Sequence, residues 1–237
     1  MARTLAYLES YDMYAIAMTQ DFSQLESWME ESDRVFPSIQ TGVADFERND
    51  VRKLVEAGSV IAIGELMTQY EGISPNSEEL NQIWELALAH DLPVGIHMSA
   101  PGAQTPSYLA SFGDPLLLDP VLKRYPELRL YLMHAGWPFL EETVSILRQH
   151  PNVYVDISFI DWQMPRHLFY AYLEGLILYG FEKRIMFGSD QNWPDAIAVA
   201  VRGIEEAPFL TADQKRDIFF SNAVRFFRFR EAQFTGR

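Results

Sequence analysis

Four ionisable side chains follow short apolar runs of the chain, and these side chains are Glu65, His97, His134 and Asp190. Apolar runs without a polar face are typical of parallel strands that are buried on both sides. In (β/α) barrels and open α/β sheets, residues at the carboxyl ends of such strands carry the chemistry. A carboxylate is costly to bury there unless it meets a metal, a cation or a substrate proton. We therefore expect the four side chains to face a common site.

Imidazole nitrogens and a carboxylate together form the ligand set of a catalytic zinc ion that keeps one position open for water. The ion lowers the pKa of that water towards ~7, and a neighbouring carboxylate can accept its proton. Each residue alone also has an ordinary structural explanation. Asp190 could cap a helix, Glu65 could form a salt bridge, and a lone strand-end histidine is more often a hydrogen-bonding residue than a ligand. Their joint occurrence favours a site for a divalent metal, with zinc as the expected ion.

Strand and helix patterns alternate along the whole chain. Seven apolar runs qualify as strands, near residues 14, 36, 61, 94, 131, 154 and 186. One βα unit takes roughly 30 residues, so the interval from His134 to Asp190 has room for the additional strand at 153–158. A doubly wound sheet remains an alternative, although no Gly-rich phosphate loop follows any strand. We predict a TIM-type (β/α) barrel of seven parallel strands. No change in composition marks a linker, so we expect a single barrel domain over residues 1–237.

Two helices carry recognisable start signals. Asn76 with Glu79 resembles a capping box, and apolar residues recur at helical spacing over 80–88. Thr211 with Gln214 forms the same pattern near the end of the chain. Histidines in the last or first turns of helices usually have structural roles, and we expect this for His90, His150 and His167.

Composition limits the possible partners. The formal charge of −14 argues against a nucleic acid as partner. No apolar stretch reaches the ~20 residues of a membrane span, and the first residues do not form a signal-peptide core. The chain has no cysteine, which excludes disulfides and thiolate catalysis. We expect a cytoplasmic protein that binds a small-molecule substrate.

Several of these segments resemble one known family. The quoted matches are residues 120–137, Gly188-Ser189-Asp190, Gly64-Glu65-Leu66, Gly95-Ile96-His97, and Ser221-Asn222-Ala223 with Phe226-Phe227. In order and spacing they are similar to the strand-end motifs and closing helix of the amidohydrolase-2 branch of the amidohydrolase superfamily. The resemblance covers nearly the whole chain. It implies a distorted (β/α) barrel and hydrolysis or non-oxidative decarboxylation of small, often aromatic or dicarboxylic, acids.

The resemblance also implies roles for the strand-end residues. His97 would be a metal ligand, and Asp190 would be a ligand or a proton shuttle. His134 would be the general acid/base or a second ligand, and Glu65 would be a possible ligand. Two tryptophans that follow the site residues could line the wall of an aromatic substrate pocket or pack under loops, namely Trp137 and Trp193.

One family feature is missing from the sequence. The first strand of the family ends in His-x-His or Glu-x-His and supplies two metal ligands, and no such motif occurs here. We therefore interpret the chain as an incomplete barrel without its first strand, and we expect weak or partial metal binding. The strands at 13–18 and 185–187 would then each lack a neighbour. Either they draw together or another chain covers the gap, and we hypothesise the second, which predicts a homo-oligomer.

The sequence leaves three functions open. The first is a metal-assisted hydrolase or non-oxidative decarboxylase of a small carboxylic acid, amide or lactone, in which Asp190 and His134 transfer protons. The second is a catalytically impaired or inactive barrel that has lost the strand-one ligands. The third is metal-free lactonase or hydratase chemistry, in which Asp190 and His134 act alone as base and acid.

Overall fold

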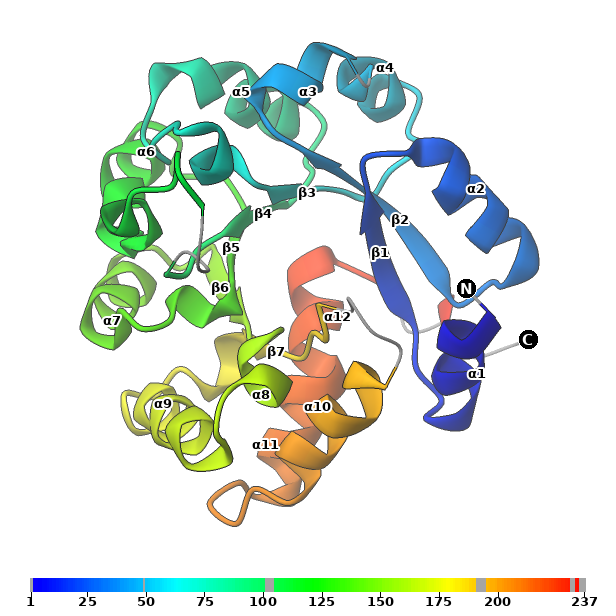
Figure 1. The fold of residues 1–237 in the computed structure, drawn as a ribbon, viewed down its shortest axis with the longest axis vertical. Coiled ribbons are helices and arrows are strands. Elements are labelled where there is room, and N and C mark those ends of the chain that lie inside the picture. The colour runs from blue at the N-terminus through cyan, green and yellow to red at the C-terminus, as the bar shows by residue number, and fades with distance from the viewer. Residues whose placement is uncertain (1, 49, 101–104, 191–194, 231–232, 235–237) are drawn as a thin grey trace.

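A computed structural model describes residues 2–48, 50–100, 105–190, 195–230 and 233–234. Its sheet contains seven parallel strands in the order of the sequence, and each strand pairs with the next. The strands are β1 (Ala15–Thr19), β2 (Val35–Thr41), β3 (Ala62–Leu66), β4 (Val94–His97), β5 (Leu130–Met133), β6 (Val153–Asp156) and β7 (Ile185–Met186). Figure 1 shows that the sheet curls into an incomplete barrel. This confirms the predicted fold class and the predicted number of strands.

Helices surround the outer face of the sheet (Figure 1). The described helices are α1 (Ala2–Ser10), α2 (Phe22–Glu31), α3 (Val43–Arg48), α4 (Val51–Glu56), α5 (Asn81–Ala89), α6 (Asp119–Arg124), α7 (Leu140–Gln149), α8 (Ile160–Gln163), α9 (Arg166–Leu178), α10 (Ala196–Glu205), α11 (Ala212–Arg216) and α12 (Asn222–Phe227), of which α12 is not on the outer face. No helix in the described part of the chain is long and apolar enough to cross a membrane. The interpretation of residues 1–237 as a single domain stays a prediction.

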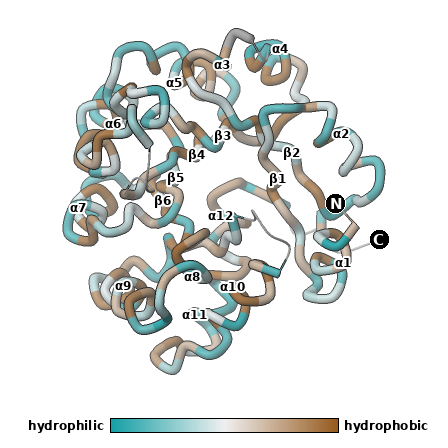
Figure 2. The backbone as a smooth tube through the Cα atoms, in the orientation of Figure 1, coloured by the Kyte–Doolittle hydropathy of each residue, from teal (hydrophilic) through white to brown (hydrophobic). Residues whose placement is uncertain are grey.

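The two faces of β5, β6 and β7 contribute to different clusters. In β5, Leu130 and Leu132 belong to the main core with the surrounding helices, whereas Tyr131 and Met133 belong to a cluster inside the barrel. This follows from the alternation of side chains along a strand. Figure 2 shows hydrophobic segments along the strands and hydrophilic segments on the outward sides of many helices. Burial on both faces explains why β5 and β7 are apolar throughout.

The C-terminal helix occupies the opening between the first and last strands. Among the described residues no strand pairing joins β7 to β1, and Figure 1 shows α12 between them. Phe226 of this helix lies 5.6 Å from the Tyr131 ring and 4.7 Å from the Tyr154 ring, measured between centroids. Met18 of β1 and Met186 of β7 pack in the same cluster. The chain therefore fills the gap with its own helix, a third remedy beside the two considered above. Self-association stays a prediction.

The same C-terminal segment covers the end of the barrel at which the strands begin. Arg129, just before β5, donates a hydrogen bond of 2.6 Å to the carbonyl oxygen of Phe226. Arg228 forms an ion pair with Asp91, which precedes β4. Further along, Phe229 lies 4.8 Å from the ring of Phe36 in β2. These contacts hold the segment across the end of the barrel opposite to the strand carboxyl ends.

Of the two predicted helix starts, one is confirmed and one is wrong. Thr211 and Gln214 form a reciprocal capping box at the start of α11. Asn76 is not a cap. Ser77 instead accepts a hydrogen bond from the backbone N–H of Glu79, and a single 3-10 turn precedes α5. Both residues are short polar side chains suited to a cap, so the sequence pattern could not distinguish these adjacent positions.

We expect Phe226→Ala to destabilise the protein by about 3–5 kcal/mol, because it removes a large buried aromatic side chain. The side chain is 3% exposed, and a void inside the barrel could not be refilled by the flanking strands. The measurement is the free energy of unfolding in urea. Leu178→Ala is the control, since Leu178 is 80% exposed, and it should change stability by less than about 0.5 kcal/mol. Similar values for the two variants would show that α12 does not stabilise the interior.

Candidate metal centre

Three side chains from neighbouring strand ends converge at the carboxyl end of the barrel. Oε1 of Glu65 lies 2.6 Å from Nδ1 of His97 and 3.4 Å from Nε2 of His134. The two imidazole nitrogens lie 3.1 Å apart. All three residues are buried, and their candidate ligand atoms lie within 4.8 Å of one another. The structure thus brings together three of the four residues that the sequence placed at one site.

Backbone geometry brings β3 and β4 close enough for this convergence. Gly64, directly before Glu65, has φ of +154°, and an added Cβ would lie 2.9 Å from the carbonyl oxygen of Gly95 in β4. A residue with a side chain at position 64 would be strained, both by this backbone conformation and by the contact with Gly95. The close approach places Glu65 beside His97, two residues after Gly95 in the neighbouring strand.

Hydrogen bonds orient the ring of His134. Its Nδ1 lies 3.0 Å from the carbonyl oxygen of Ser158, which can only accept, so Nδ1 carries the proton. Nε2 then presents its lone pair towards Glu65 when the ring is neutral. Asp156 supports this arrangement by accepting hydrogen bonds from the backbone N–H of His134 at 3.2 Å and from the hydroxyl of Ser158 at 2.5 Å. Such outer contacts fix the orientation of a ligand.

His97 is held in a comparable way. Its Nε2 lies 3.1 Å from the hydroxyl of Ser99, and that hydroxyl can donate to the carbonyl oxygen of Ala100 at 3.2 Å. In the ion-free protein, Nδ1 donates to the Glu65 carboxylate at 2.6 Å, and Nε2 can accept from the Ser99 hydroxyl. If that hydroxyl instead donates to Ala100, Nε2 can carry the ring proton and leave the lone pair of Nδ1 for an ion. The side-chain amide of Gln69 also donates to the backbone carbonyl of His97. Both histidines can therefore direct a lone pair at one point.

The charges of the three groups are strongly coupled. Burial alone would raise the pKa of Glu65, but hydrogen bonds from His134 and His97 outweigh it and lower that pKa to about 2. Burial would lower the pKa of His134, but the neighbouring Glu65 carboxylate raises it to about 9. Burial lowers the pKa of His97. Without an ion, the group is therefore a carboxylate that shares one proton with two imidazoles.

The donor atoms fit a divalent metal ion. Tetrahedral coordination with metal–ligand distances of about 2.0–2.1 Å would separate the ligand atoms by roughly 3.3–3.4 Å. Two of the three observed separations, 3.1 Å and 3.4 Å, lie near this value. The third, 2.6 Å, is that of a hydrogen bond, and replacing its proton by an ion would lengthen it. One carboxylate and two histidines leave a fourth position open, as in catalytic zinc sites.

Asp190 lies close to this group but does not belong to it. Its carboxylate is not among the donor atoms that converge within 4.8 Å. Its charge nevertheless interacts with those of His134 and Glu65, and burial raises the pKa of this half-buried carboxyl. The roles predicted for Asp190, as catalytic residue and as ligand, stay predictions.

The turns after three successive strands share an unusual backbone conformation. His134, Phe159 and Asp190 are non-glycine residues with φ of 60°, 67° and 41°, in the left-handed region. Such conformations are uncommon for non-glycine residues in general and tend to occur at functional sites. Here they turn the chain after β5, β6 and β7 at the mouth of the barrel.

Aromatic rings flank the two histidines, and the sequence analysis did not identify them. Tyr70 and Tyr108 lie 5.1 Å and 5.8 Å from the ring of His97. On the other side, Phe159 lies 5.7 Å from the ring of His134, and Trp162 lies 5.6 Å from Phe159. Their position in the segments that follow strands could have marked them as site residues. Aromatic residues are common in such segments, however, so this signal does not distinguish them. Trp137 is half-buried and packs against the main core, and Trp193 lies outside the described residues.

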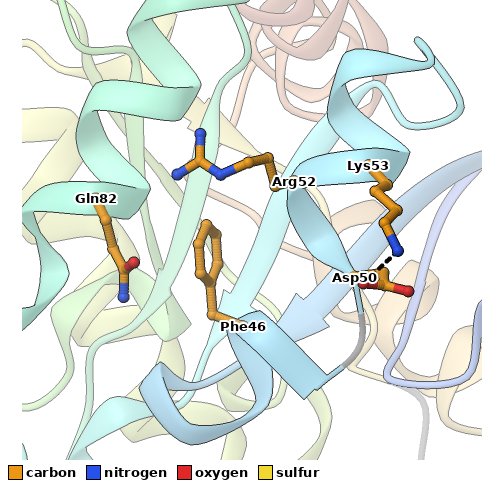
Figure 3. Close-up of a pocket in the computed structure, with 5 residues that line it drawn as sticks. All are labelled: Phe46, Asp50, Arg52, Lys53 and Gln82. Atoms are coloured by element: carbon orange, nitrogen blue, oxygen red, sulfur yellow. Dashed lines mark ion pairs between the residues drawn. The ribbon is translucent and has the colours of Figure 1, made fainter.

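Pockets elsewhere on the surface are distinct from this site. Figure 3 shows one on the outer side, lined by Phe46, Asp50, Arg52, Lys53 and Gln82. It shares no residue with the candidate metal centre. The remaining histidines also lie elsewhere. Nε2 of His150 contacts Asp119 at 2.9 Å, and His167 is exposed in the first turn of α9.

The fold and the donor set define a TIM-type barrel with a candidate divalent metal site at the carboxyl ends of its strands. The sequence pattern of one family, described as amidohydrolase, matches residues 3–229, and the chain belongs to this family. No curated protein matches the chain in sequence.

Solved structures of similar fold include several enzymes. One is a dihydroxybenzoic acid decarboxylase from Polaromonas sp. JS666 with bound manganese, at a TM-score of 0.70 and 14% identity, covering 99% of this chain and 88% of that one. A probable 2-pyrone-4,6-dicarboxylic acid hydrolase from Acinetobacter baumannii with citric acid bound has a TM-score of 0.66 and 14% identity, covering 95% and 87%. A 5-carboxyvanillate decarboxylase from Novosphingobium aromaticivorans with manganese has a TM-score of 0.63 and 17% identity. The match covers 87% of this chain and 68% of that one. At these identities the likeness shows the fold alone.

We expect metal affinity to increase with pH. In the ion-free protein the pKa of His134 is about 9, so below that pH the incoming ion must displace a proton. The association constant should therefore rise by about tenfold per pH unit for one displaced proton, and should level off above the pKa. The measurement is zinc affinity, determined by competition with a chelating dye from roughly pH 6 to pH 9. A constant affinity over this range would contradict the shared proton.

Proposed function

We propose that this protein is a metal-dependent hydrolase or non-oxidative decarboxylase that acts on a small carboxylic acid, amide or lactone. The observation that carries the proposal is the convergence of Glu65, His97 and His134 at the open end of the barrel. Membership in the amidohydrolase family and the enzymes of similar fold support it. The supporting hydrogen bonds around both histidines argue against the alternative of a decayed site, because they orient ligand atoms that an inactive barrel would not need.

In this proposal Glu65, His97 and His134 hold a divalent ion. A bound ion would supply Lewis acidity for a substrate carbonyl or carboxylate and for water. The convergence of Nε2 with the other donors favours the second-ligand role for His134 over the general acid/base role. Two histidines and one carboxylate suit zinc, which remains our predicted ion, and manganese is the alternative that two of the similar structures suggest.

Asp190 would act as the proton-transfer group. It is half-buried beside the ligands, and its raised pKa makes it a stronger base than an exposed aspartate. Proton transfer by Asp190 would serve either reaction, by accepting a proton from water in hydrolysis or by donating one to carbon in decarboxylation. Tyr70 and Phe159 pack against the two histidines and, with Trp162 beside Phe159, would contact the substrate. We retain Trp137 and Trp193 as further candidates for its binding.

Three further properties belong to the proposal without a direct observation. We propose that residues 1–237 act as one barrel domain, that the protein associates into a homo-oligomer, and that it works in the cytoplasm on a small molecule. Weak or partial metal binding was expected because the strand-one ligands are missing. Three convergent donors, however, can form a catalytic site by themselves, which predicts full metal binding. The metal content of the purified protein decides between weak and full binding.

Substitutions should separate the ligand role from the proton-transfer role. Asp190→Asn removes the proton acceptor and should reduce kcat on the order of 10²-fold or more while the bound metal is retained. Glu65→Gln and His97→Asn should lose the metal together with activity. Metal content by elemental analysis and turnover of a panel of small lactones, amides and aromatic acids are the two measurements.

The control is His167→Asn, which lies on an exposed surface of α9 and should change neither measurement. Loss of the metal in Asp190→Asn would instead make Asp190 a ligand. Full activity of metal-free protein would overturn the proposal in favour of metal-free acid–base chemistry.

A further inference from the structure

The indole of Trp162 contacts the turn that carries Asp190. Its Nε1–H donates a hydrogen bond of 2.6 Å to the carbonyl oxygen of Ser189, 27 residues further along the chain. This carbonyl group and the backbone N–H of Asp190 belong to the same peptide unit. Because a peptide unit is planar, a hydrogen bond that fixes the carbonyl group also fixes the N–H. Trp162 therefore constrains the backbone from which the Asp190 carboxylate extends.

The backbone at Asp190 needs such a constraint. Its φ of 41° lies in the left-handed region, which is unfavourable for a residue with a side chain. A conformation of this kind persists only when the surrounding structure determines it. A free turn would relax to more common backbone angles and would carry the carboxylate to another position. The hydrogen bond from Trp162 supplies a restraint from outside the turn.

The turn after β7 also touches the turn after β6. An added Cβ at Gly188 would lie 2.9 Å from Cβ of Ser158 and 3.5 Å from Cγ of Asp156. The two turns are therefore in direct contact. Ser158 and Asp156 are the groups that orient His134, so the segment after β6 borders both His134 and the turn of Asp190.

The neighbours of Trp162 hold its ring in place. The ring packs edge-to-face against Phe159, with centroids 5.6 Å apart, and Phe159 packs in the same way against the ring of His134 at 5.7 Å. Arg166 secures the backbone of α8 by donating a hydrogen bond of 3.0 Å to the carbonyl oxygen of Asp161. The indole N–H is thus presented from a segment that is fixed on both sides, as a positioning group requires.

The hydrogen bond is not explained by packing alone. Trp162 is half-buried, so water could serve its N–H, and a phenylalanine would fill much of the same space beside Phe159. The fold instead directs the N–H to the carbonyl group that adjoins Asp190.

We propose that Trp162 is a positioning residue, which holds Asp190 in the place from which it transfers a proton. The inference rests on the proposed function, in which Asp190 moves that proton. It gives the segment after β6 two separate tasks, since Ser158 orients the candidate ligand His134 and Trp162 orients the proton-transfer group. Loss of the indole N–H should therefore impair proton transfer without loss of the ion.

The first test is Trp162→Phe, which keeps an aromatic ring beside Phe159 and removes the N–H. We expect kcat to fall about tenfold, because a displaced acid or base transfers protons less well, while KM changes by less than about twofold. The metal content should stay the same. Because Trp162 acts through Asp190, Trp162→Phe should add less than about a twofold loss to that of Asp190→Asn. The measurements are turnover of the compound panel and elemental analysis.

Two further variants separate the hydrogen bond from packing. Trp28→Phe is the matched control, since Trp28 is also half-buried but lies in α2, and it should change neither kcat nor metal content. Replacement of Trp162 by its benzothienyl isostere, which keeps the ring shape and lacks only the N–H, should reduce kcat as Trp162→Phe does. Unchanged kcat in the isostere, or a full additional loss in the Asp190→Asn background, would overturn the inference.

A measurement without turnover distinguishes this inference from the proposed function. In ¹⁵N NMR spectra, the indole N–H resonance of Trp162 is assigned by its loss in Trp162→Phe. It should shift in Asp190→Asn, whereas the indole resonance of Trp28 should not. A Trp162 resonance that Asp190→Asn leaves in place would refute the coupling of the two residues. If the unmodified protein turns over no compound, the proposed function fails, and this resonance decides the inference by itself.

Discussion

The buried carboxylate of Glu65 between two imidazoles is the interaction on which the site depends. A lone carboxylate with this burial would be driven to its neutral form. Its two histidine neighbours instead keep it charged, and it in turn raises the pKa of His134. Neither histidine can move independently, because Ser158 and Ser99 hold the far side of each ring. The three groups form one electrostatic unit that an ion can enter by replacing a proton.

The barrel must keep this unit rigid although its first and last strands do not pair with each other. A sheet edge normally exposes unpaired backbone groups and invites association. Here α12 enters the opening, and its aromatic side chains fill the interior beneath the site, where Phe226 contacts Tyr131 and Tyr154. β1 remains half-exposed along its whole length. The C-terminal helix fills the interior of the barrel, but it covers the open edge of the sheet less completely.

The sequence alone determined the strands and the residues at their ends. Hydrophobic runs such as 60–65 and 93–97 are local signals, because a strand buried on both faces needs apolar residues at every position. The topology then required Glu65, His97 and His134 to meet, whatever their distance in the chain. The capping box of Thr211 and Gln214 was an equally local signal, since a capping box is complete within four residues.

Only the tertiary structure decided how these residues are held and what surrounds them. The roles of Asp156 and Ser158 depend on hydrogen bonds to His134 across 22 and 24 residues of chain, which no local pattern encodes. The same is true of the rings of Tyr70 and Phe159, and of Phe226 inside the barrel. Asp190 interacts with the charges of His134 and Glu65, and the turn after β7 sets its position, which sequence order cannot specify; its predicted role as a ligand stays a prediction. Strand formation depends on neighbours along the chain, whereas these contacts depend on packing between segments that only the folded barrel brings together.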